Sequence, residues 1–440
     1  MAQIAGLSDF REHGPPGDVG TFIQPTSAVV FQFTFSGITT YAAMRIGISG
    51  WVLIDHGADP ATVINTALSA AGTHDVTLLM REDWVITTTL SIPIGVYLHG
   101  LGWKYSLNYN AVGNCITITG DNVKIRDLKI DIVAGAGGGG ARPNCILANA
   151  RTNLEITKVW LVGDNTVGYD GSDVRQCGIV FTTVTYSRIA LCRSNDHIVA
   201  DICFSASVYN TVTGNTCIGT AQRGIYLIAV SNNNTLTGNT CQGKQADGIN
   251  LNTSAGNIIE MNICIGNGNY GIIIDNFSDF NKVSNNYTSG NAAASIRVNN
   301  ANCDGNQIEF NTVEDGAPSN IGTTTRSYGN YDPSANVFVG SVGIMPTTPL
   351  ITFYDNDLTP SVAGSNVFLT AILHGGARDI SMFDDGVEGQ RIIIISSNPG
   401  NPTTIKDAGD LLLTADWTDG ANKTLELVFD GADWRELSRV

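Results

Sequence analysis

"NTVTGNTC", residues 210–217, points to the fold because the chain repeats its pattern. Copies of the form N-x-[VIL]-x-x-N begin at Asn210, Asn234, Asn257, Asn281 and Asn306, at spacings of 24, 23, 24 and 25 residues. Two helices with their turns need about 33 residues. A repeat this short therefore favours three short strands separated by three bends.

Two apolar ladders share this period. One consists of Ile179, Ile202, Ile225, Ile249, Ile272 and Ile296, and the other of Ile189, Val212, Leu236, Ile259, Val283 and Ile308. Around each position apolar and polar residues alternate, as they do in a strand. Stacked coils of this kind form a parallel β-solenoid in which like residues lie above like. We therefore predict an all-β parallel β-helix of about eleven coils, spanning residues ~75 to ~340.

The second asparagine of each copy and the cysteine that follows it are assigned to the scaffold. The stacked asparagine amides should hydrogen-bond to one another and to the backbone of the bend, rather than to a sugar. The nine cysteines lie between Cys115 and Cys303, and their one-per-repeat placement favours buried, reduced thiols over disulfides. No C-x-x-C pair occurs, so we expect neither a metal site nor a cofactor.

Composition and charge exclude several classes of function. The 440 residues carry a net charge of -16, and no basic cluster is evident that would pair with the phosphates of a nucleic acid. The first residues lack the basic start and apolar run of a signal peptide. No apolar stretch approaches the ~18 residues that a membrane span needs. We therefore expect no membrane insertion, and synthesis in the cytoplasm without a signal peptide.

The two ends of the solenoid can also be recognised. In "ADPATVINTALSAAG", Asp59 is placed to cap a helix that ends at Gly72 and covers the open end of the solenoid. After "GIMPTTPLI" the repeats stop and alternating strands begin. We predict three parts: an N-terminal segment (1–50), the β-helix domain with its capping helix at 59–72 (51–340), and a β-rich, sandwich-like C-terminal domain (345–440).

The order of these opening elements resembles a known family. The helix, "IPIGVYLHGLG" and "NCITITGDNVKIRDLKID" are similar to the first coils of pectate-lyase-like right-handed β-helix proteins, especially bacteriophage tailspikes. The similarity covers roughly residues 50 to 330 and implies a right-handed parallel β-helix. The Arg-x-Pro-x-x-Arg signature of pectate lyases is absent, as are the Asp-Pro-His-Asp of alginate epimerases and the Gly-Asp-Gly-x-x-Asp-Asp insertion. Calcium-dependent pectate cleavage is therefore not expected.

The resemblance also implies a biological role. Tailspikes close with a Trp-x-Glu-x-Ser-Arg ending, here Trp434 to Arg439, on a threefold axis, which implies a homotrimer. Residues 1–50 would attach the protein to the phage tail or baseplate, so it would be a virion protein that acts extracellularly. Its partner would be a bacterial surface polysaccharide, either capsule or lipopolysaccharide, which it binds and cleaves by hydrolysis or β-elimination. A non-catalytic receptor-binding spike and a purely structural virion component remain the alternatives.

Candidate site residues lie where the repeat is broken or carries charge. Arg223, Asp247 and Tyr270 precede the glycine of successive "x-G-I" strands, and we expect them to share one position. An insertion, "LVGDNTVGYDGSDVRQC", and the next coil, "CRSNDHIVAD", supply further polar groups, and long loops often carry function. A glycosidase needs two carboxylates. We predict one groove with catalytic and substrate-binding groups: the former are Asp173, Asp196, His197 and Asp247, and the latter are Asp164, Tyr169, Asp170, Arg175, Arg193, Arg223 and Tyr270. Asp275 with Asp279 is a second candidate.

Overall fold

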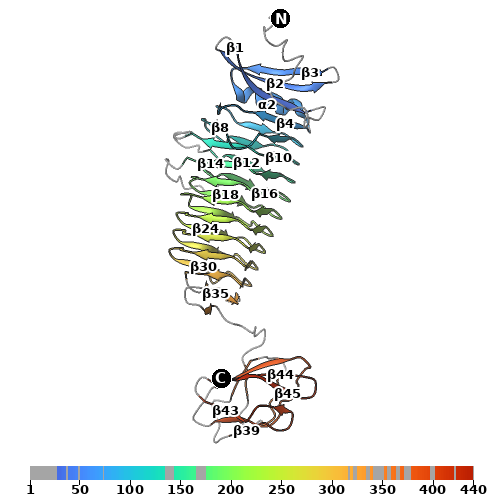
Figure 1. The fold of residues 1–440 in the computed structure, drawn as a ribbon, viewed down its shortest axis with the longest axis vertical. Helices are drawn as coiled ribbons and strands as arrows, with labels where there is room; N and C mark the ends of the chain where they lie inside the picture. The colour runs from blue at the N-terminus through green and yellow to red at the C-terminus, as the bar shows by residue number, and fades with distance from the viewer. Residues whose placement is uncertain are drawn as a thin grey trace. The chain divides into compact units, whose positions relative to one another are not determined.

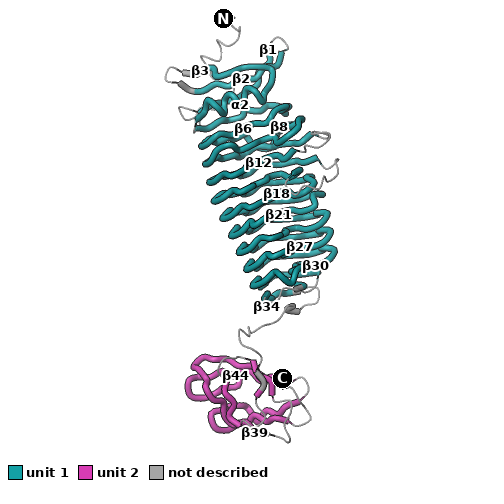
Figure 2. Tube along the Cα trace, turned by 180° about the vertical axis from the view of Figure 1, so that it is seen from behind, with its two compact units in different colours: residues 1–342 teal, residues 343–440 magenta. Residues whose placement is uncertain are grey.

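The structure of this chain is a computed structural model. It describes residues 27–35, 38–47, 50–72, 74–133, 143–164, 175–315, 318–320, 325–332, 337–339, 351–353, 358–362, 367–370, 378–396, 402–420 and 423–439. The chain divides into two compact units, Met1–Val342 and Gly343–Val440 (Figure 2). Each unit is described by itself.

The first unit is built from three long sheets whose strands stack coil upon coil (Figure 1). We name them sheets A, B and C. In hydrogen-bonding order, sheet A consists of β3 (Gly50–Gly57), β2 (Ile38–Gly47), β1 (Ala28–Phe35), β4 (Asp75–Leu79), β7 (Tyr97–His99), β10 (Lys124–Arg126), β13 (Glu155–Thr157), β16 (Arg188–Ala190), β19 (Thr211–Thr213), β22 (Thr235–Thr237), β25 (Ile258–Glu260), β28 (Lys282–Ser284), β31 (Gln307–Glu309) and β34 (Arg326–Tyr328).

The other two sheets contribute one strand each to most coils. Sheet B consists of β36 (Val337–Val339), β35 (Asn330–Asp332), β32 (Thr312–Val313), β29 (Tyr287–Ser289), β26 (Ile263–Ile265), β23 (Thr240–Gln242), β20 (Thr216–Ile218), β17 (Arg193–Asn195), β14 (Trp160–Val162), β11 (Lys129–Ile132), β8 (Ser106–Tyr109) and β5 (Trp84–Ile86). Sheet C consists of β33 (Ser319–Asn320), β30 (Ala294–Val298), β27 (Tyr270–Asp275), β24 (Asp247–Asn252), β21 (Arg223–Ile228), β18 (Ala200–Ser205), β15 (Ile179–Thr182), β12 (Ile146–Asn149), β9 (Ile116–Ile118) and β6 (Leu90–Ile92).

This topology confirms the predicted fold class, an all-β parallel β-helix with a β-rich C-terminal unit. Sheet A alone holds eleven described strands from β4 to β34, all paired in parallel. Both predicted apolar ladders are buried inside, and all nine cysteines are buried free thiols. None of the helices in the described part of the chain is long and apolar enough to span a bilayer.

A short helix covers the first coils. α2 (Pro60–Ala71) begins after Asp59, whose side chain accepts hydrogen bonds from the N–H groups of Ala61 and Thr62. The helix residues Ile64 and Leu68 are buried. The strands β1, β2 and β3 lie beside this helix and continue sheet A beyond β4, so residues 28–47 are joined to the solenoid. The rest of the predicted N-terminal segment lies largely outside the described residues.

The asparagines of the repeat form the predicted ladders at the bends. The Asn210 N–H donates to Oδ1 of Asn234 at 2.9 Å, and the Asn215 N–H donates to Oδ1 of Asn239 at 3.0 Å. The second ladder continues through Asn262, Asn286, Asn311 and Asn330. Every member is at most 1% exposed. These amides satisfy buried backbone groups, so they belong to the scaffold, as predicted.

The second unit is a small β domain. Its sheets consist of β37 (Ile351–Thr352), β38 (Val367–Leu369), β40 (Arg391–Ile395), β44 (Thr424–Phe429), β45 (Trp434–Arg439) and β42 (Leu411–Leu412), and of β39 (Arg378–Ile380), β41 (Thr403–Ile405) and β43 (Trp417–Thr418). Trp434 is fully buried in its core.

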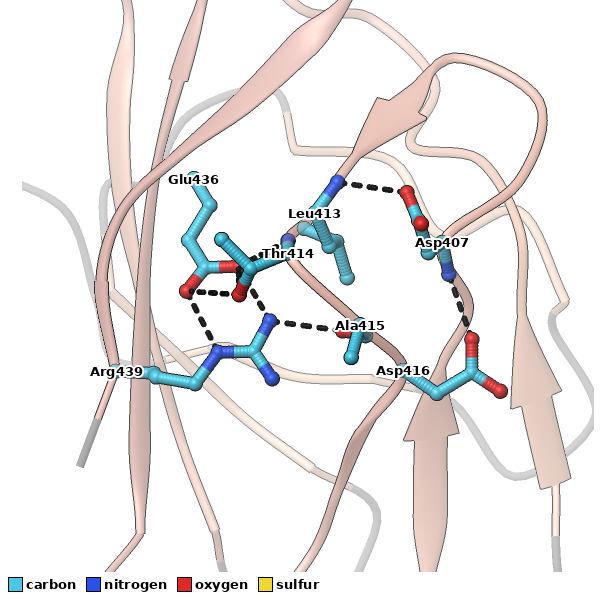
Figure 3. A network of polar contacts seen from close by, with 7 residues as sticks. All are labelled: Asp407, Leu413, Thr414, Ala415, Asp416, Glu436 and Arg439. Carbon is cyan, nitrogen blue, oxygen red and sulfur yellow. Dashed lines mark hydrogen bonds and ion pairs between the residues drawn. The ribbon is translucent and has the colours of Figure 1, made fainter.

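The charged residues of the chain's ending tie β45 to a neighbouring loop (Figure 3). Glu436 accepts hydrogen bonds from the Thr414 N–H at 2.8 Å and from Nε of Arg439 at 2.6 Å. The bond from Arg439 holds the pKa of Glu436 down to about 2. These contacts within one chain give the Glu and Arg of the ending a structural role.

Candidate functional site

The predicted site residues fall in three places rather than in one groove. Arg223, Asp247 and Tyr270 lie on the outward face of sheet C, whereas Arg193 and Asp196 lie on or beside sheet B. His197 is inside the solenoid. Asp164 is half-buried and Arg175 is exposed. The other predicted residues, Tyr169, Asp170 and Asp173, lie outside the described part of the chain.

The sheet C residues share one ladder position, as predicted. The Cα partners in β21 and β24 are Arg223 and Asp247, and Tyr270 follows in β27 by the same register. Nε of Arg223 lies 3.9 Å from Oδ2 of Asp247. Ile249 and Leu251 are buried in the core, whereas Asp247 and Asn250 share the outward face, where Nδ2 of Asn250 donates to Oδ2 of Asp247.

Asp247 is an unusual carboxylate for a sheet surface, because it is only 5% exposed. Burial raises its pKa, whereas Asn250, which donates from Nδ2 to Oδ2 at 2.7 Å, and then Arg223 lower it. The negative charge of Asp275, on the next strand, also raises the pKa of Asp247. The raised pKa favours the protonated form, which can donate a proton to a substrate oxygen.

Other groups on this face could bind a sugar. The guanidinium of Arg223 lies 4.1 Å from the ring centroid of Tyr226. Asp275, at the end of β27, accepts from the Asn276 N–H at 2.9 Å and from Nδ2 of Asn299 at 3.3 Å. Asp275 lies on the same face of sheet C as Asp247, and its register partner in β24 is Asn252, at the other end of that strand.

The second candidate pair, Asp275 with Asp279, lies at the end of β27 and in the bend that follows it. Asp279 lies past the end of β27 and accepts the Asp304 N–H at 2.7 Å, which is a bend contact. The pairing of Asp275 with Asp279 stays a prediction.

An apolar cluster bounds the polar residues on the side of the earlier coils. It lies outside the main core and consists of Cys177, Val180, Ile198, Val199, Ala200, Cys203 and Tyr226. All of these residues are at most 8% exposed. The outward face of sheet C thus changes from apolar at β15 and β18 to polar at β21, β24 and β27.

On sheet B, Arg193 and Asp196 belong to a different set of contacts. Arg193 is paired in register with Trp160, and its guanidinium lies 5.0 Å from the indole centroid. Asp196 accepts a hydrogen bond of 2.7 Å from Nδ2 of Asn195, whose Oδ1 accepts from Nε1 of Trp160, also at 2.7 Å. This connected set faces away from the core. Trp160 precedes the insertion at residues 161–177, and the other members follow it.

His197 is 2% exposed and lies inside the solenoid, where it cannot meet a glycan. A Cβ on Gly178 would lie 3.0 Å from its Nε2, and Ser194 and Asp201 line the same space. Burial, together with the charge of Lys244, lowers its pKa to about 3. The expectation that His197 converges with the outward-facing groups is therefore wrong, because its side chain points inward.

Comparisons with known proteins were made for sequence and structure. A family described as "Periplasmic copper-binding protein (NosD)" matches residues 153–358, slightly less than half of the chain. A search of curated proteins finds no match to this chain.

The copper named in that family's description does not fit the residues of this chain. Burial raises the pKa of the buried Cys192 thiol to about 12, and thiolates are the form that binds metal. The described residues contain no group of three or more His, Cys, Asp or Glu side chains able to hold a metal ion. No step of the chemistry below is therefore assigned to a metal.

Solved structures with similarity to the chain are β-helix proteins. The Dettilon tailspike protein is 15% identical, with 84% of this chain and 74% of that chain covered at a TM-score of 0.48. The enzymatically active domain of bacteriophage CBA120 tailspike protein 2 is 13% identical, with 92% and 61% covered at 0.45. The A-module of Azotobacter vinelandii mannuronan C-5 epimerase AlgE6 is 15% identical, with 62% and 94% covered at 0.38. At this distance none of them assigns an activity, which has to be argued from the residues of the chain itself.

Proposed function

We propose that this chain binds and cleaves a bacterial surface polysaccharide, capsule or lipopolysaccharide, on the outward face of sheet C. The observation that carries the proposal is Asp247, a carboxyl group with a raised pKa beside Arg223 on a sheet surface. Tyr270 and Asp275, which are both half-buried, supply further aromatic and polar contacts on the same face.

The residues support hydrolysis with two carboxyl groups in different roles. Asp247, whose pKa is raised by burial, would act as the acid and donate a proton to the oxygen of the leaving sugar. Asp275 would take a proton from the attacking water, whose oxygen bonds to the anomeric carbon as the glycosidic bond breaks. The products are two shorter chains, and no oxidant or cofactor is consumed. Arg223 and Asn250 would hold Asp247 and the sugar in place.

A tailspike is the setting that agrees best with the sequence resemblance. In this setting residues 1–50 would attach to the phage tail or baseplate, residues 51–340 would carry the glycan site, and residues 345–440 would mediate trimer formation or bind glycan. The protein would act as a homotrimer, outside the cell, as part of the virion. Mass measurement in solution would test the trimer independently of activity.

Cleavage is tested by incubating the protein with a panel of capsular polysaccharides and lipopolysaccharides and measuring chain length. We expect one substrate to be shortened with new reducing ends and without a rise in absorbance at 235 nm. The Asp247→Asn variant should lose at least about 100-fold in rate, because it cannot act as the acid. Glu260→Gln is the matched control, because Glu260 is half-buried on sheet A and also loses one charge.

Two results would change this assignment. Absorbance at 235 nm that rises with cleavage would indicate elimination, for which Tyr270 rather than Asp275 is the nearest candidate base. A binding-only spike is the second candidate function, and the 5% exposure of Asp247 favours it. Retained glycan binding without cleavage of any substrate, and with no effect of Asp247→Asn, would establish that alternative.

A further inference from the structure

A second polar and aromatic surface lies on sheet B, away from Asp247. We name it the tryptophan patch, and it consists of Trp103, Lys129, Lys158, Trp160 and Arg193. Register pairs Lys129 with Trp160 and Trp160 with Arg193 in three successive strands, β11, β14 and β17. Nζ of Lys129 and Cζ of Arg193 lie 4.8 Å and 5.0 Å from the Trp160 ring centroid. The indole is thus held between two cations.

Trp103 completes the patch at its edge. Its ring centroid lies 6.1 Å from that of Trp160 in an edge-on arrangement, and its Nε1 donates to the Lys158 carbonyl at 2.7 Å. The Trp103 side chain remains 37% exposed. An aromatic ring fixed in this way presents part of its face to solvent, where the C–H groups of a sugar ring can pack.

Two of the cations of the patch have no anionic partner in the described part of the chain. Lys129 has Asp131 at 3.6 Å, whereas Lys158 and Arg193 are exposed and make no ion pair with a described residue. A guanidinium that packs over an indole still has its N–H donors in its own plane. These donors can bind a carboxylate or phosphate.

The charge of the surrounding coils differs from that of the rest of the chain. Residues 97–197 contain ten Lys or Arg and eight Asp or Glu, although the whole chain carries a net charge of -16. Of these cations only Arg193 was predicted to bind substrate, because Lys129, Lys158 and Arg193 are about 30 residues apart and come together only through stacking.

We infer that the tryptophan patch is a second glycan-binding surface, and that its ligand is an acidic polysaccharide. Arg193 and Lys158 would pair with the acidic groups and Trp103 would pack on a sugar ring. Nucleic acid suits the patch less well, because both faces of Trp160 are covered by cations and cannot stack on bases. The inference rests on the proposed polysaccharide function, but binding at the patch does not require Asp247.

The test is binding of the full chain to polygalacturonate and alginate, with dextran as the neutral polymer, at low and at high salt. We expect both acidic polymers to bind, with an affinity that falls as salt rises, and dextran not to bind. Arg193→Gln should weaken this binding about tenfold, the effect of losing one charge-assisted hydrogen bond. Lys158→Gln provides an independent variant at an exposed position.

Arg188→Gln is the matched control, because Arg188 is an exposed arginine on sheet A outside the patch. It should leave affinity within about twofold. Asp247→Asn should also leave binding at the patch unchanged, which separates this inference from the proposed cleavage.

Three outcomes would overturn the inference. They are failure of both acidic polymers to bind, equal effects of Arg193→Gln and Arg188→Gln, and tighter binding of a single-stranded DNA oligonucleotide than of either polymer.

Discussion

The bends that lead from sheet B to sheet C satisfy their buried polar groups in two different ways. In the regular coils Asn267 and Asn291 are stacked: the N–H and Nδ2 of Asn267 donate to Oδ1 of Asn291, and Asn291 donates in turn to Asp315. One coil before them Lys244 occupies the asparagine position, and its ammonium pairs with Asp201, both side chains being 0% exposed. An amide can serve as donor and acceptor at once, so its ladder can be extended coil by coil. A buried charge instead needs one particular partner.

The surroundings of the charged pair explain how it fits. Asp201 takes the inward position that Gly224 and Gly248 hold in the following coils, where a Cβ would lie 2.6 Å and 2.5 Å from the nearest atom. Ser194 donates to Oδ1 of Asp201 at 3.0 Å. Even with these partners, burial raises the pKa of Asp201 to about 6. The buried ion pair thus selects one particular partner for each charge. It does so at a desolvation cost that the asparagine ladder does not have.

The largest effect is expected from breaking the ion pair on one side. Lys244→Met leaves the Asp201 carboxylate buried beside Ser194 alone and should lower the free energy of unfolding by about 3–5 kcal/mol at pH 7.5. The double variant Asp201→Asn/Lys244→Met removes both charges and should recover much of this loss. Urea unfolding measures both. A Lys244→Met variant within about 1 kcal/mol of the wild type would contradict a tightly coupled pair.

Breaking the asparagine ladder should cost less. Asn239→Leu removes the donor to the Val212 carbonyl and the acceptor for the Asn215 N–H, and leaves these backbone groups buried and unpaired. We expect a loss of about 2–3 kcal/mol in the same urea experiment. Asn285→Gly is the control, since Asn285 is exposed and has a φ of 56°, which glycine adopts freely. A similar loss from both variants would argue against a special role for the ladder.

The smallest effect is a pH dependence confined to the surroundings of the buried ion pair. His197 has a folded pKa of about 3 against an ordinary value of 6.5, so only the unfolded chain gains this proton as pH falls between those values. The contribution of neutral His197 to the free energy of unfolding is present above pH 6.5. It should decline by about 2 kcal/mol from pH 7 to pH 5. Asp201 opposes it from about pH 6 down to 3.8, because its raised pKa makes the folded chain bind a proton first.

A variant isolates the histidine from this opposing effect. His197→Asn keeps Asp201 and Lys244, so the stability difference between wild type and variant should shrink by about 2 kcal/mol between pH 7 and pH 5. Urea unfolding at the two pH values measures this difference. A difference that stays constant would mean that His197 does not titrate as its burial requires.

Much of the scaffold could be predicted because its signals are periodic. The asparagine and isoleucine ladders, the buried cysteines and the helix after Asp59 each follow from local chemistry repeated at one spacing. The grouping of Arg223 with Asp247 followed from the same period.

The site was predicted less well, because contacts across the coil have no fixed spacing in sequence. His197 and Asp196 are adjacent in the chain, yet one side chain points inward and the other lies beside sheet B. Asp275 and the tryptophan patch were missed as groups for the same reason: side-chain direction and neighbouring coils decide which residues meet.

The outward face of sheet C is where we propose that a polysaccharide is bound and cut. A crystal structure of the Asp247→Asn variant with an oligosaccharide from the cleaved substrate tests it most directly. We predict sugar residues in contact with Arg223 and Tyr270, with a glycosidic oxygen within hydrogen-bond distance of residue 247. An oligosaccharide bound elsewhere on the protein, with none on sheet C, would contradict this account.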